Sequence, residues 1–150
     1  MTRRILGLAA AATLSLALTG CAFASPVSTQ MDYAPSDGAR VVLSQEGSDV
    51  RLENVMVLTA GEGEAAQIFG IIANDSGEDA TVTVAIEGES SDVDVPAGGV
   101  ANLEDEVDPY EGLDLAPGAT VTGSFTYQGT VSHEVPILDG TLEPYDQYLP

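Results

Sequence analysis

Thr81-Val82-Thr83-Val84-Ala85-Ile86-Glu87 is the stretch of sequence that decides the fold. Its polar and apolar side chains alternate, with Val82, Val84 and Ile86 in the apolar phase. Successive side chains of a β-strand point to opposite faces of a sheet, whereas a helix would repeat every three to four residues. The alternation therefore predicts a strand with one face on a core and the other in solvent.

A second stretch with the same alternation, Ala119 to Tyr127, predicts another half-buried strand. Val121 and Phe125 stand in its apolar phase, between threonine and serine residues. Gln128-Gly129 follows at once and predicts a tight turn into a further strand from Val131 to Leu138.

Further short strands are expected toward the N-terminus and in the middle of the chain. Within one of them the apolar phase slips near Glu53-Asn54, which indicates a bulge or a crossing between two sheets. Another is apolar on both faces, which is typical of a central, buried strand. These strands are expected at Arg40–Ser44, Asp49–Leu58, Gln67–Ala73 (the one apolar on both faces), Ser91–Val95 and Val100–Leu103.

Seven to nine short strands, spaced by Gly and Pro turns and without a long amphipathic helix after residue 20, predict an all-β domain. The expected architecture is an immunoglobulin-like or cupredoxin-like antiparallel β-sandwich over residues 39–138, with a small barrel as the alternative. Residues 21–38 are expected to be a flexible tether. Residues 139–150 are expected to be a C-terminal tail that docks on a partner, folds back on the sandwich or stays disordered.

The N-terminal twenty residues are expected to be a lipoprotein signal peptide. Arg3-Arg4 precedes an uncharged run from Ile5 to Leu18, which is long enough for a signal sequence and short for a membrane span. Leu18-Thr19-Gly20-Cys21 resembles the lipobox of bacterial lipoproteins. That resemblance implies cleavage before Cys21, a lipid on its sulfur, and anchorage at the extracytoplasmic face of a cell membrane. Cleavage at the A-x-A-like Ala22-Phe23-Ala24 is the alternative.

The chain after residue 20 is strongly acidic. It has all 24 acidic residues, no lysine and only Arg40 and Arg51, so removal of the signal changes the formal net charge from −20 to −22. Such a surface repels nucleic acid, which we exclude as a partner. Cys21 is the sole cysteine, so its lipidation leaves no thiol for redox chemistry or catalysis.

Three residues are weak candidates for metal binding: Met31, Met56 and His133. Thioethers and imidazole bind copper, but the neighbours of Met56 are those of a core residue. His133 shares the apolar phase of Val131 and Val135, where a structural histidine is the plainer interpretation. We expect no resident metal or cofactor.

An acidic loop from Glu104 to Asp114 has enough carboxylates for weak calcium binding. It lacks the residue order of an EF-hand loop, so a solvated loop is the plainer interpretation. No histidine–serine–aspartate or carboxylate motif supports an enzyme.

Residues 40–138, together with the lipobox and tether, resemble actinobacterial cell-envelope lipoproteins. The resemblance rests on the stretch Val50–Val55, the stretch Ile68–Asn74 and the Gly77-Glu78-Asp79 turn. These lipoproteins are distantly similar to the PCu(A)C-type copper chaperones, which have a cupredoxin-like or immunoglobulin-like sandwich. The copper site of that family needs two histidines and two methionines in a set order, and this chain has one histidine.

The sequence thus predicts a membrane-anchored lipoprotein whose sandwich is not catalytic and binds or scaffolds an envelope protein. A metal-handling protein, for copper or calcium, is the alternative.

Overall fold

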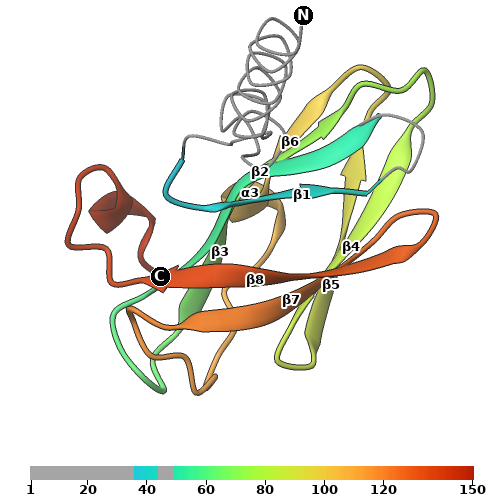
Figure 1. Cartoon of the computed structure of the whole chain (residues 1–150). Coiled ribbons are helices and arrows are strands. Elements are labelled where there is room, and N and C mark those ends of the chain that lie inside the picture. Colours follow the sequence, from blue (N-terminus) through green and yellow to red (C-terminus); the bar gives the residue numbers. More distant parts are fainter. Residues whose placement is uncertain (1–35, 44–48) are drawn as a thin grey trace, which may run out of the picture. The chain divides into compact units, whose positions relative to one another are not determined.

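A computed structural model describes residues 36–43 and 49–150. This part of the chain is built almost entirely of strands, and none of its helices has the length and apolar character of a membrane span. The strands are β1 (Ala39–Val42), β2 (Val50–Thr59), β3 (Ala66–Asn74), β4 (Ala80–Ile86), β5 (Glu89–Val95), β6 (Val100–Asn102), β7 (Thr120–Thr126) and β8 (Thr130–Leu138). The short helices are α3 (Leu103–Glu106) and the 3₁₀ helix η2 (Tyr145–Tyr148), as Figure 1 shows.

The expected all-β sandwich is confirmed. Sheet A consists of β1, β2, β3 and β6, and sheet B consists of β5, β4, β7 and β8. The end of β8 also joins sheet A, so all eight strands form one continuous sheet folded over on itself. In the described residues no ladder joins the end strands β5 and β6.

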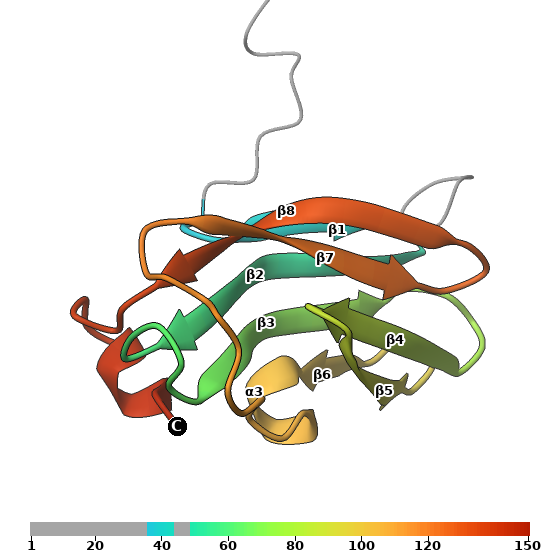
Figure 2. The same cartoon turned by 90° about the horizontal axis from the view of Figure 1, so that it is seen from below.

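One pairing departs from the antiparallel expectation. β8 runs parallel to β2, with Val57 opposite Ile137 and Leu58 opposite Leu138, so the two strands end side by side (Figure 2). Nearer the start of β2, the same edge is occupied by β1, which lies opposite Arg51 and Leu52. β8 can therefore reach β2 only beyond β1.

The phase slip expected at Glu53-Asn54 is confirmed as a bulge. The β2–β3 register shifts between Glu53 and Met56, and Asn54 has a positive φ of 56°. Gly70 of β3 lies against the bulge with φ 139°, and a Cβ placed on it would lie 3.0 Å from the carbonyl oxygens of Glu53 and Asn54. The bulge therefore requires a glycine at position 70.

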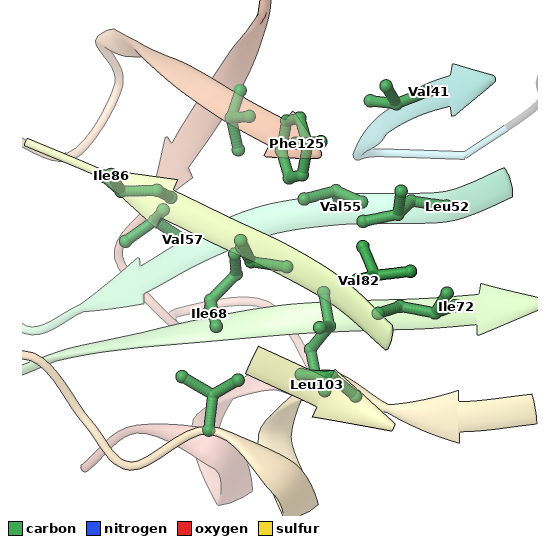
Figure 3. Close-up of a cluster of buried hydrophobic side chains, with 14 of the residues drawn as sticks. Val41, Leu52, Val55, Val57, Ile68, Ile72, Val82, Ile86, Leu103 and Phe125 are labelled. Atoms are coloured by element: carbon green, nitrogen blue, oxygen red, sulfur yellow. The ribbon is translucent and has the colours of Figure 1, made fainter. Parts of the chain in front are cut away.

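The apolar residues of the alternating stretches form the core between the sheets. Val82, Val84 and Ile86 of β4 are buried on the same face of sheet B as Phe125 of the neighbouring β7, which is fully buried. Figure 3 shows side chains of both sheets pointing into this space. β3 is central, between β2 and β6, as expected, but it is not buried on both faces: Ile71 is 40% exposed.

The C-terminal segment, residues 139–150, folds back on the outer face of sheet A. Tyr145 of η2 is buried there with Met56 and Leu58 of β2. Its ring meets that of Phe69 edge to face, with centroids 5.7 Å apart. Of the alternatives for this segment, the structure therefore shows the second, packing on the sandwich.

Candidate functional site

The structure does not bring the candidate metal ligands together. Cys21 and Met31 lie outside the described residues. Met56 is fully buried under Tyr145 and pairs with Phe69 in sheet A. His133 belongs to the β7–β8 ladder of sheet B. The thioether and the imidazole thus lie in different surroundings.

His133 shares the phase of Val135, as expected, but the expectation that it packs into the core is wrong, because its side chain is exposed. Residues 130–136 of β8 have a paired neighbour, β7, along one edge, and β8 meets β2 only at residues 137–138. Opposite His133 stands Gly123, and the space over this glycine is filled by the ring of Phe125 and by Val135. The core is therefore filled at this point without the imidazole of His133.

The acidic loop is held by its apolar residues rather than by a metal-like cluster. Leu103, Val107 and Leu115 are buried in the core. Tyr110 exchanges two backbone hydrogen bonds of 2.8 Å with Ala66, and Gln67 Nε2 donates to the carbonyl of Val107 at 3.0 Å. Within the described residues, no three His, Cys, Asp or Glu side chains converge as metal ligands would.

The outer face of sheet B is polar throughout. Threonine hydroxyls donate across the strands to carboxylates, from Thr81 to Asp94 at 2.7 Å and from Thr83 to Asp92 at 2.6 Å. Glu134 accepts hydrogen bonds from both Thr122 and Thr120, which lower its pKa. A depression of about 310 Å³, lined by Asp79, Thr81, Asp94 and Pro96, opens at the β4–β5 end. The threonine hydroxyls of this face are thus hydrogen-bonded to its carboxylates, and the face has no exposed large apolar residue.

The outer face of sheet A, unlike that of sheet B, has exposed apolar side chains. Its half not covered by the C-terminal segment, here called the open face, consists of two cross-strand rows. They are Val42, Arg51, Ala73 and Val100 in the first row, and Arg40, Glu53, Ile71 and Asn102 in the second. Val42, Ile71 and Val100 are 39%, 40% and 65% exposed. Three of the four exposed large apolar side chains of the described residues therefore gather on this face.

Ion pairs join the two arginines of the open face to neighbouring carboxylates. The Nε atoms of Arg40 and Arg51 both lie 3.1 Å from Glu53 Oε1, and Arg51 also pairs with Asp75. The hydrogen bond to Asp75 raises the pKa of Arg51, and burial opposes this shift. Among the described residues, the two guanidinium groups thus pair with two carboxylates, and the formal charges of these four side chains cancel.

The open face was not predicted from the sequence. Ile71 was expected to be buried, and Val42 and Val100 stand in runs too short to show which side points outward. One signal was available: Arg40 and Arg51, the only cations after residue 20, stand in neighbouring strands. On so acidic a chain, their proximity indicates a locally neutral surface.

The chain resembles known proteins in structure but not in sequence. No family model and no curated protein matches the sequence. Among solved structures, the chain is similar to the copper-bound PCuAC domain from PmoF2, at 13% sequence identity and a TM-score of 0.48. The match covers 67% of this chain and 97% of that domain.

Proposed function

We propose that this protein is a lipoprotein, anchored through Cys21 to the extracytoplasmic face of a cell membrane, whose sandwich is a non-catalytic binding module. The anchorage is supported by the basic start, the short apolar run and the lipobox-like Leu18-Thr19-Gly20-Cys21. The binding role is supported by the open face, where Val42, Ile71 and Val100 are exposed on the same side of the sheet as Arg40 and Arg51, which both pair with Glu53. Exposed apolar side chains grouped in this way are typical of protein interaction sites.

The partner we propose is an envelope protein with an aliphatic contact surface and no net negative charge. Aliphatic side chains are needed to match Val42, Ile71 and Val100. A strongly acidic partner would be repelled by the carboxylates around the open face. A neutral contact surface matches the cancelled charges of Arg40, Arg51, Glu53 and Asp75.

Site-specific photo-crosslinking in cells tests the binding role. A crosslinking residue is placed at Ile71 or Val100 of the full-length protein, and at Ser132, an exposed position of β8 in sheet B, as the matched control. We expect the same single product at positions 71 and 100 and none at 132. The product should disappear on Val42→Glu and contain a protein without net negative charge. A product shared with position 132, an acidic partner or the absence of a product would contradict the proposal.

Mass spectrometry of the membrane fraction tests the anchorage separately. We expect a mature chain that begins at Cys21 and has the added mass of a diacylglycerol. Cys21→Ser should abolish this modification and release the protein from the membrane. An unmodified chain that begins after Ala24 would show secretion without a lipid anchor.

A further inference from the structure

The C-terminal segment contacts the residues through which the chain enters the sandwich. Ser36–Gly38, here called the tether base, directly precede β1. The hydroxyl of Tyr145 donates to Asp37 Oδ2 at 2.8 Å, across 108 residues of sequence. Burial and this hydrogen bond raise the pKa of Tyr145, so the phenol keeps its proton and the bond persists at neutral pH.

The bulge of β2 also contacts the tether base. The N–H of Gly38 donates to Asn54 Oδ1 at 2.9 Å. A Cβ on Gly38 would lie 2.4 Å from the carbonyl carbon of Asn54, so backbone meets backbone at this point. The Asn54 side chain also interacts with the Tyr145 hydroxyl. The tether base, the bulge and η2 therefore meet in one hydrogen-bonded junction.

The position of Tyr145 at this junction is fixed by packing. Phe69 contacts both rings of η2, with centroids 5.7 Å from Tyr145 and 4.9 Å from Tyr148. Leu149 packs against the same cluster and lies over Gly140, where a Cβ would be 2.6 Å from a Leu149 methyl carbon. The hydroxyl is thus presented to Asp37 by a preformed surface, at a small entropic cost.

From this geometry we infer that the C-terminal segment is a strap that holds the tether base on sheet A and so sets the length of the membrane tether. Beyond the tether base, β1 has its own anchors, because Val41 and Leu43 are buried in the core. Opening the strap therefore frees residues 36–39 and leaves the rest of β1 in place. Four extended residues add about 14 Å of reach. This inference rests on the proposed lipid anchorage for its function, although the strap itself does not depend on the lipid.

Hydrogen exchange of the full-length protein in detergent tests the strap. Tyr145→Phe removes one hydroxyl and keeps the ring. Tyr127→Phe is the control, because the hydroxyl of Tyr127 accepts a hydrogen bond from the adjacent Gln128 instead. A hydrogen bond to a charged group is worth enough to accelerate opening about tenfold or more. We expect such an acceleration at Gly38 and Ala39 in Tyr145→Phe alone. The amide of Leu43, bonded to Val50, should not change.

Two results would contradict the proposal that the C-terminal segment is a strap. One is equal exchange at Gly38 in the two variants. The other is equal acceleration in β4 and β5, which would show that the hydroxyl stabilises the whole sandwich and not the tether base.

The change in reach is measured with the lipidated protein in phosphatidylcholine vesicles. A fluorophore is attached to Ser132→Cys, which offers the one free thiol once Cys21 is lipidated, and energy transfer to a lipid-phase acceptor reports its height above the bilayer. We expect a greater mean height for Tyr145→Phe than for Tyr127→Phe. Unchanged heights would contradict the tether-length function, whereas failure of both proteins to bind vesicles would contradict the lipid anchorage instead.

Discussion

At the scale of single residues, the bulge of β2 depends on one glycine of the neighbouring strand. Gly70 combines a φ of 139°, which L-residues rarely adopt, with backbone oxygens 3.0 Å from where a Cβ would lie. Gly70→Ala should therefore lower the free energy of unfolding by about 2 kcal/mol or more. Urea denaturation measures this change.

Gly77 provides the matched control for this substitution. A Cβ on Gly77 would have nothing within 4 Å, and its φ is not positive. Gly77→Ala should leave stability within about 0.5 kcal/mol of the wild type. Equal midpoints for the two variants would show that the bulge tolerates a side chain and that the close approach is not a constraint.

The carboxyl of Glu134 should titrate below its ordinary range. Hydrogen bonds from Thr122 and Thr120 lower its pKa, so the folded protein binds this proton less readily than the unfolded chain. The resulting stabilisation is present above the unfolded value near 4.5 and is lost as the pH falls through the lower, folded value. NMR titration of the side-chain carboxyl should show this pKa rising in Thr122→Val. Thr126→Val, which removes a hydroxyl bonded to Thr130 instead, should leave it unchanged.

At the scale of elements, the C-terminal segment offers a matched pair of leucines. Leu149 packs against the cluster of Met56, Leu58 and Tyr145, whereas Leu142 is 59% exposed. Leu149→Ala should cost about 1–2 kcal/mol of stability, and Leu142→Ala less than about 0.5 kcal/mol. Thermal or urea unfolding compares them. If the two costs were equal, the segment would not be packed on sheet A in solution.

The sequence predicted those elements whose two faces differ. Val82, Val84 and Ile86 alternate with threonine, and the slip at Glu53-Asn54 leaves a visible change of phase, because both patterns record local contact with a core. The exposure of His133 was not predicted, because the pattern does not show that β8 has no second paired neighbour there among the described strands.

The binding face and the strap depend on contacts between distant parts of the chain. Ile71 is exposed because η2 covers Phe69 and stops short of it, which no local pattern reveals. Tyr145 and Tyr148 were visible as aromatic residues in a polar segment, and this was the available signal that residues 139–150 pack on the sandwich.

At the scale of the whole molecule, the excess of carboxylates opposes folding by mutual repulsion. With a formal net charge of −20 at pH 7, stability should increase as salt screens the charges. Raising NaCl from about 0.05 M to about 0.5 M should raise Tm by about 3–6 °C at neutral pH. Differential scanning calorimetry measures this shift.

The control for the salt effect is pH. Near the pI of about 4.1 many carboxylates are protonated and the repulsion is small, so the same salt should change Tm little. An equal increase at both pH values would point to a general salting-out effect rather than to relief of repulsion.

The place of β8 in both sheets has a consequence for biogenesis. Val57 and Ile137 pair across 80 residues of sequence. Neither layer has its full set of strand neighbours until β8 has emerged from the ribosome. Contacts so distant in sequence form slowly, so the nascent chain should stay open until β8 has been synthesised.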